Sequence, residues 1–199
     1  MSDDRPYHHG ALREAVISAA VAEVEAVGAT AVSMREIARR AGVSHAAPAH
    51  HFGDRAGIFT AIATQGFTLA AESIAPAAVG PYGFLDGGAA YVAFAVTHPG
   101  HFEVMFRPAL YREDDAQLMA ARDRAFTILF GSARELAHEH GHGDPDALVA
   151  AGWSLSHGLA TLLLTGNIAR YLADSQADLA DVVARGLTAL GAIAGSRHA

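Results

Sequence analysis

Apolar side chains recur every three or four positions through almost the whole chain, and no sustained strand-like alternation of apolar and polar residues interrupts them. This spacing gives each predicted helix one apolar face. The first helix is predicted over residues 9–27, with Gly28 suited to end it. Later helices are predicted over residues 84–97, 100–107, 114–138, 145–171 and 176–193. The fold class is therefore expected to be all-α.

A break in this pattern divides the chain in two. Turn-forming residues gather at Pro76, Gly80, Pro81 and Gly83. We therefore expect a three-helix N-terminal domain with a linker helix, residues 8–75, and a C-terminal helical domain, residues 82–195. The chain has 199 residues and no cysteine, so it can bury a core, and disulfides, thiolate zinc sites and cysteine nucleophiles are excluded.

The location of the protein is predicted from what the sequence lacks. A secretory signal requires an apolar segment near the N-terminus. The first residues of this sequence are instead acidic and polar. No stretch reaches the roughly 20 apolar residues of a membrane span. A cytoplasmic protein without a membrane partner is expected.

Positive charge is concentrated in one short segment of an acidic chain. The formal net charge is −7, and every basic residue other than histidine is an arginine. From Ser33 to Arg55, four arginines stand against two acidic residues, which leaves +2, and three histidines join them. Such a local field matters more for binding an anionic partner than the sum over the chain.

That segment reads as two helices joined by a tight turn. Ser33 and Glu36 form a capping box, in which each side chain bonds to the other residue's backbone amide. Gly42 ends this helix, and Ser44 is predicted to cap a very short helix over residues 45–51. Asp54 is then predicted to cap a linker helix that reaches residue 74.

The segment from Ser33 to Phe52 resembles the helix-turn-helix of the TetR family in the order and spacing of these features, including the Ala-Gly-Val-Ser turn. The resemblance implies a homodimeric regulator that binds a palindromic operator in double-stranded DNA and is released by a small effector. One departure concerns Ala49 and His50, which stand where an aromatic and a basic residue usually follow the proline.

Small and polar side chains suit a helix that enters the major groove, and helix N-termini and arginines suit phosphate contacts. On this basis the expected DNA-binding residues are Ser33, Arg35, Ser44, His45, Ala46, Ala47, Ala49, His50, His51 and Arg55.

The C-terminal half carries a second, less specific resemblance. Trp153, His157 and Gly158 match the Trp-x-x-x-His-Gly motif of one TetR subgroup. Bulky apolar residues with few polar members suit a cavity for a mostly apolar ligand, although ordinary core is the simpler explanation for any one of them. The predicted ligand-binding set is Phe94, Phe102, Met105, Phe106, Phe126, Trp153, His157 and Tyr171.

The last two predicted helices carry more apolar surface than a small domain needs. We expect them to pair with their symmetry mates as a four-helix bundle in a homodimer. The predicted interface residues are Leu159, Leu163, Val183, Leu187 and Leu190.

An alternative function is a zinc-dependent hydrolase, because His138, Glu139 and His142 match the H-E-x-x-H motif. The second histidine lies between two glycines and before Asp144-Pro145, where the helix is expected to have ended. We therefore favour a regulator that is not an enzyme and needs no cofactor or metal.

Overall fold

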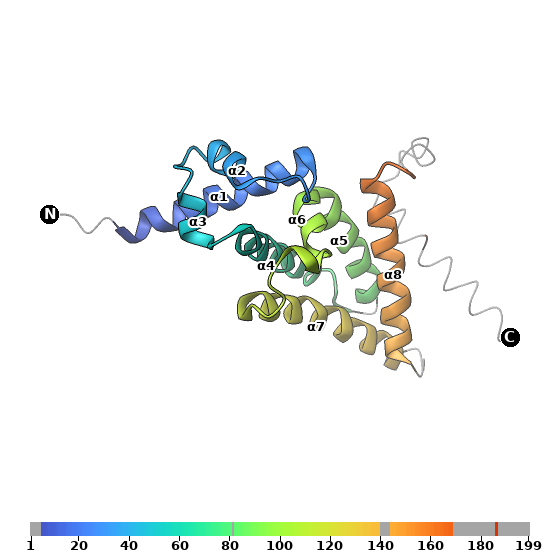
Figure 1. The fold of residues 1–199 in the computed structure, drawn as a ribbon. Helices are drawn as coiled ribbons and strands as arrows, with labels where there is room; N and C mark the ends of the chain where they lie inside the picture. Colours follow the sequence, from blue (N-terminus) through green and yellow to red (C-terminus); the bar gives the residue numbers. More distant parts are fainter. Residues whose placement is uncertain (1–4, 81, 140–143, 169–185, 187–199) are drawn as a thin grey trace. The chain divides into compact units, whose positions relative to one another are not determined.

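The computed structural model describes residues 5–80, 82–139, 144–168 and 186, and over these residues the regular structure is entirely helical (Figure 1). The α helices are α1 (Arg5–Val27), α2 (Met34–Arg40), α3 (Ala47–Phe52), α4 (Arg55–Ile74), α5 (Gly83–Thr97), α6 (Pro99–Met105), α7 (Ala116–Glu139) and α8 (Pro145–Leu164). A short 3-10 helix, η1, spans Pro108–Leu110. The all-α prediction is confirmed, and the helix predicted over residues 176–193 lies outside the described residues, apart from residue 186.

The helices form two compact units that do not follow the order of the chain. The first contains the described residues up to Phe67 together with Pro99–Ala121. The second contains Thr68–His98 and the described residues from Arg122 onward. The two compact units differ from the predicted domains at residues 8–75 and 82–195, because α6 packs with the N-terminal helices. The domain boundaries stay a prediction.

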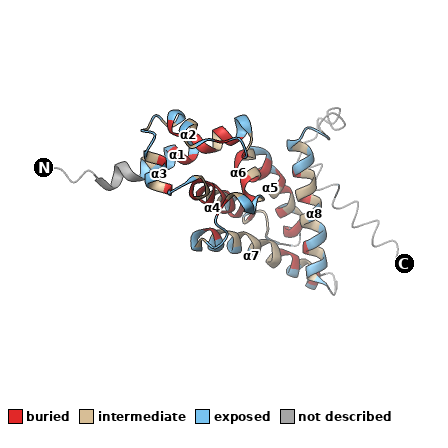
Figure 2. Ribbon diagram, in the orientation of Figure 1, coloured by how far each residue is buried: buried red, intermediate tan, exposed pale blue. Residues whose placement is uncertain are grey.

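The core of the first unit forms around α1. Val16, Ile17, Ala20 and Val24 recur at helical spacing, and each exposes 2% or less of its surface. Helices α2 and α6 pack against α1, whose buried positions are red in Figure 2. The spacing of apolar residues in the sequence places Val27 on this same face of the helix. That prediction was wrong, because α1 ends at Val27 and its side chain is 49% exposed.

Helix α8 contributes to the second unit mainly through its contact with α5. Phe84, Ala133 and Val149 bring α5, α7 and α8 together in one buried cluster. Further along, Leu159 and Leu163 of α8 pack against Ala89 and Val92 of α5. Much of the rest of α8 is exposed or half-buried in Figure 2.

One close approach makes the α5–α8 contact sensitive to substitution. A Cβ added at Gly152 would lie 2.4 Å from Cζ of Phe84 and 2.7 Å from its Cε1, and this ring is buried. Overpacking costs about 1–3 kcal/mol, more than the roughly 1 kcal/mol that alanine gains over glycine in a helix.

We therefore expect Gly152→Ala to lower the free energy of unfolding by up to about 2 kcal/mol. Gly131→Ala on α7 is the matched control, because its added Cβ meets nothing within 4 Å. That control is expected to be neutral or to gain up to about 1 kcal/mol from helix propensity. Urea unfolding of both variants measures the difference, and equal stabilities would contradict the described packing.

Candidate nucleic-acid interface

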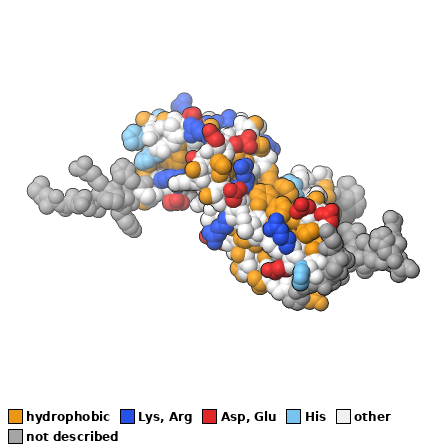
Figure 3. Space-filling model, turned by 90° about the horizontal axis from the view of Figure 1, so that it is seen from below, with side chains coloured by type: hydrophobic (Ala, Val, Ile, Leu, Met, Phe, Trp, Pro, Cys, Tyr) orange, Lys and Arg blue, Asp and Glu red, His pale blue; other side chains and the backbone are white. Residues whose placement is uncertain are grey.

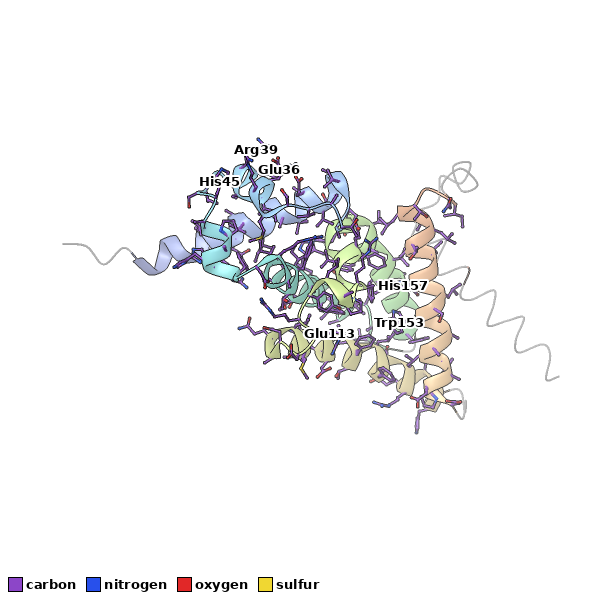
Figure 4. The ribbon with its side chains drawn as sticks, viewed as in Figure 1. Glu36, Arg39, His45, Glu113, Trp153 and His157 are labelled. Carbon is purple, nitrogen blue, oxygen red and sulfur yellow. The ribbon has the colours of Figure 1, made fainter. Side chains whose placement is uncertain are left out.

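Helix α2 begins as the sequence predicts, at the Ser33 side chain. Ser33 Oγ accepts a hydrogen bond from the Glu36 backbone N–H at 3.1 Å. The predicted second bond of the capping box, from the Ser33 backbone N–H to the Glu36 carboxylate, was wrong. The Glu36 carboxylate instead accepts from Nε of Arg39 at 2.9 Å (Figure 4). This charge-assisted bond, one turn away on the same helix, is stronger than a bond to a neutral amide and lowers the pKa of Glu36.

The turn after α2 is fixed by its backbone. Gly42 has a φ of 67°, the left-handed conformation that glycine adopts most easily. The Val43 N–H donates to the Ala38 carbonyl at 3.0 Å and the Gly42 N–H to the Arg39 carbonyl at 3.2 Å. These two bonds form a Schellman motif, which ends α2 and turns the chain toward α3.

The short helix predicted over residues 45–51 starts later than expected and is one residue shorter. Helix α3 spans Ala47–Phe52, and its N-cap is Ala46, which makes no side-chain capping bond. The prediction that Ser44 caps this helix was wrong. The Ser44 backbone carbonyl accepts from the Ala47 N–H in a turn that precedes the helix. Pro48 lies in the first turn of α3, where its missing N–H costs little stability.

Helix α3 has one buried face and one exposed face. Pro48 and Phe52 are buried, and the Arg13 guanidinium of α1 lies 5.4 Å from the centre of the Phe52 ring. Ala47 and His51 are half-buried. Among the predicted DNA-binding residues from Ser44 onward, those that lie exposed are Ser44, His45, Ala46, Ala49 and His50. Histidines and arginines are visible among the surface side chains in Figure 3.

The arginines of this segment differ in their partners. Arg40 pairs with the buried Glu23 of α1 at 3.0 Å, which joins α1 to α2. Arg55 donates to the carbonyls of Ala29 and Thr30, and its guanidinium lies 5.0 Å from the centre of the Phe59 ring. The structure thus gives Arg55 a role in fixing the loop between α1 and α2, and its predicted DNA contact stays a prediction.

Arg35 contrasts with these arginines. It is exposed, and no ion pair involves it within the described part of the chain. Its guanidinium is therefore available to an anionic partner.

Two side chains that the sequence did not indicate, Glu103 and Arg112, bond to the loops on either side of α2 and α3. Glu103 of α6 accepts from the Ala29 N–H at 2.9 Å, directly after Gly28 turns the chain with a φ of 77°. Arg112 bonds to the Asp54 carboxylate at 2.9 Å. Asp54 also accepts from the Gly57 N–H at 2.9 Å, which confirms it as the cap of α4 and lowers its pKa. Separations of 58 and 74 residues leave no local signal for these contacts.

The second unit contains a polar pair among aromatic rings. The Tyr91 hydroxyl of α5 lies 2.8 Å from Nδ1 of His157 on α8. Trp153 lies with its ring centre 5.2 Å from that of Phe126, in an edge-to-face arrangement. Burial raises the pKa of Tyr91 and lowers that of His157, so both side chains are neutral near pH 7. Figure 4 labels Trp153 and His157 on α8.

The predicted ligand-binding set is divided by the fold. The second unit brings together Phe126, Trp153 and His157. In the same unit Phe94 stacks on His98, with 5.2 Å between the two ring centres. The other described members, Phe102, Met105 and Phe106, belong to the first unit with α6. Tyr171 lies outside the described residues. Sequence reasoning missed Tyr91, which no local feature of α5 singles out.

The predicted dimer residues are described only in part. Leu159 and Leu163 pack against α5, whereas Leu162 and Leu164 on the same helix are 42% and 38% exposed. Val183, Leu187 and Leu190 lie outside the described residues. Helix α8 is long and apolar enough to cross a membrane by length and composition alone, a test that core helices of other proteins also pass.

The H-E-x-x-H segment is also incompletely described. His138 is exposed in the last turn of α7, and His142 lies outside the described residues. Across the part of the chain that the structure does describe, no group of three or more His, Cys, Asp or Glu side chains could hold a metal ion.

Two family models match this chain. The model described as bacterial regulatory proteins, tetR family, matches residues 16–62, which include the Ser33–Phe52 segment. The model described as tetracyclin repressor-like, C-terminal domain, matches residues 84–190, more than half of the chain. Neither description points to a hydrolase.

Solved structures share the fold. A protein of unknown function from Rhodococcus sp. RHA1 is 29% identical, with a TM-score of 0.70 over 92% of this chain and 95% of that one. PfmR, a TetR family transcriptional regulator from Thermus thermophilus, is 20% identical, with a TM-score of 0.61 over 85% and 93%. A TetR family regulator from Marinobacter aquaeolei VT8 is 17% identical, with a TM-score of 0.65 over 90% and 94%.

A comparison with curated proteins gives no match. The family is shown instead by the two models, which together cover the capped helix-turn-helix and most of the helical C-terminal half. This chain belongs to the TetR family and is a transcriptional regulator with an N-terminal helix-turn-helix.

Proposed function

We propose that this regulator is a cytoplasmic repressor that binds a palindromic DNA operator as a homodimer and is released by a small, mostly apolar effector. The observation that carries the DNA-binding part is the two-sided packing of α3. Pro48 and Phe52 hold its back face in the core, while small residues and imidazoles lie exposed on the other side. This arrangement suits close approach to the floor of the major groove.

The DNA contacts fall into two groups. His45, Ala46, Ala49 and His50 are exposed and suit contacts with base edges or nearby phosphates. Arg35 suits a phosphate, because it is exposed and carries charge that no acidic residue of the described chain neutralises by an ion pair. Ser33, Ser44, Ala47, His51 and Arg55 support this surface or lie at its edge.

We assign DNA binding to residues 8–75 and effector binding with dimerisation to residues 82–195. The two family models support this division, because one ends at residue 62 and the other begins at residue 84. We further propose that the C-terminal domain is of the Trp-x-x-x-His-Gly type, since Trp153 and His157 of that motif lie together with Tyr91 and Phe126.

For the dimer we propose that the outer face of α8 pairs with a second copy, joined by the residues that follow it, which include Val183, Leu187 and Leu190. Leu162 and Leu164 are exposed, and only 17% of the most apolar window of α8 is buried within the chain. Exposed apolar surface of this kind marks an interaction site. Leu159 and Leu163 contribute from the α5 side of the helix, by holding it in place.

For the effector we propose a site that includes Phe126, Trp153, His157 and Tyr91. Aromatic walls with few polar groups suit an apolar ligand. Because burial keeps both His157 and Tyr91 neutral near pH 7, the pair favours an uncharged ligand that exchanges a hydrogen bond with one of them. Phe94 belongs to the same unit, whereas we assign Phe102, Met105 and Phe106 to the packing of α6.

The first prediction concerns the operator. Selection from random duplex DNA should yield a palindrome with half-sites about one helical turn or somewhat more apart, and log affinity should fall linearly with log salt. Arg35→Ala and His50→Ala should each weaken binding at least about tenfold, and Arg35→Ala should reduce the salt slope by about one for each phosphate that it no longer neutralises. Arg124→Ala, at an exposed position of α7, is the control. Unchanged binding by both variants would place the interface elsewhere.

The second prediction concerns the dimer. Leu162→Asp should shift the protein toward monomer in sedimentation velocity and weaken operator binding, because one half-site alone holds DNA weakly. Leu162 is chosen over Leu163 because a charge at Leu163 would also disturb the contact with α5. Val79→Asp, at an apolar residue that is 67% exposed and lies off α8, should remain dimeric. Sedimentation of the wild type as a monomer at micromolar concentration would refute the proposal.

The third prediction concerns the effector. In a thermal-shift screen of uncharged, mostly apolar compounds, hits should raise the Tm of the wild type, and Trp153→Ala should bind them at least about tenfold more weakly. Tyr82→Ala, at a 67% exposed aromatic in the same unit, is the control. Operator titration should then show that each hit lowers DNA affinity and that operator lowers affinity for the hit by the same factor. Hits that bind equally well with and without operator would disprove the coupling.

A further inference from the structure

The exposed surface of α3 contains no permanent cation. The chain has no lysine, and no arginine lies between Arg40 and Arg55. Positive charge in this interval can come only from its three histidines. His45 and His50 are exposed, and the His50 ring centre lies 5.3 Å from that of the half-buried His51.

The carboxylates closest in sequence to these histidines already bond to arginines. No acidic residue lies between Glu36 and Asp54. Glu36, on α2, bonds to Arg39, and Asp54, directly after α3, bonds to Arg112.

The other charged groups of α1 and α2 are basic or already bonded, with one exception. Glu14 is exposed on α1, and it forms no ion pair with His45 or His50 within the described part of the chain. Glu25 of α1 accepts from the Gly100 N–H. On α1, Arg13 lies over the Phe52 ring and Glu23 pairs with Arg40 of α2. Arg35 is the remaining charged residue of α2 and is itself a cation. In a DNA complex, phosphates are therefore the anions that His45 and His50 would meet.

Imidazole is the side chain that ordinarily gains or loses its charge between pH 5 and 8. A nearby negative charge favours the protonated form, so an imidazole that moves next to a phosphate takes up or retains a proton. Binding and protonation then favour each other by thermodynamic linkage.

We propose that operator binding by this regulator is coupled to proton uptake at His45 and His50, so that affinity for DNA rises as the pH falls from 8 to 6. The inference rests on the proposed DNA-binding function and adds to it a dependence on pH. The contribution of the two histidines to DNA affinity is present while they carry the proton and is lost as the pH rises and the proton is released. Arg35, which stays charged over this range, supplies the part of the affinity that does not change.

The size of the effect follows from the number of imidazoles. A dimer presents two copies of each histidine, and each proton linked to binding adds to the dependence on pH. We expect operator affinity to be at least about tenfold higher at pH 6 than at pH 8. The dependence on salt should also be steeper at pH 6, because more phosphates are neutralised by cations.

The experiment uses the full-length protein and the duplex that it selects from random DNA at pH 6. Fluorescence anisotropy measures the affinity at pH 6, 7 and 8 at constant ionic strength, and circular dichroism checks folding at each pH. The double variant His45→Asn and His50→Asn should lose most of the change with pH. His138→Asn, at an exposed histidine of α7, should keep it. His50→Arg should bind more tightly than the wild type at pH 8 and depend less on pH.

The outcomes separate this inference from the proposed function. Operator binding by the wild type that does not change between pH 6 and 8 would overturn the inference and leave the proposed function standing. A double variant that folds, binds and keeps the full change with pH would overturn the assignment to His45 and His50. Failure to select any duplex at any pH would overturn the proposed function and the inference together.

Discussion

The burial of Pro48 and Phe52 is the constraint on which the candidate interface depends. Helix α3 has only six residues, and helices shorter than about 12 residues are marginal in water without tertiary contacts. No side chain caps its N-terminus, so local capping does not stabilise it. The helix is held by its buried face and by the Schellman turn at Gly42, and this burial is what leaves the opposite face exposed.

Contacts from distant parts of the chain then fix the frame around α3. Glu23 pairs with Arg40, Glu103 accepts from the Ala29 N–H, and Arg112 bonds to Asp54. Each bond holds one end of a short helix or one loop, where the backbone has few other restraints. The exposed pair of Arg112 and Asp54 contributes orientation more than stability, because surface ion pairs are weak.

These pairings change the electrostatics that composition alone suggests. The segment from Ser33 to Arg55 has four arginines, but Arg39 and Arg40 form ion pairs and Arg55 bonds to backbone carbonyls. In the proposed interface, Arg35 is therefore the main permanent charge, and His45 and His50 are the groups whose charge we propose to vary. On this proposal, a protein with a formal net charge of −7 would present to DNA a local surface whose charge varies with pH.

The sequence by itself determined the all-α class, the Ser33 and Asp54 caps and the turn at Gly42, because helical periodicity, capping and glycine conformation act over a few neighbouring residues. Two local details were not predicted, because several nearby partners compete over a few residues: Glu36 bonds to Arg39, and Ser44 does not cap α3. Tertiary structure decided that Tyr91 rather than Phe102 lies beside His157. It also placed α6 with the N-terminal helices. The position of Tyr91 and the placement of α6 depend on which side chains meet across 50 residues or more of chain, and local spacing carries no information about such meetings.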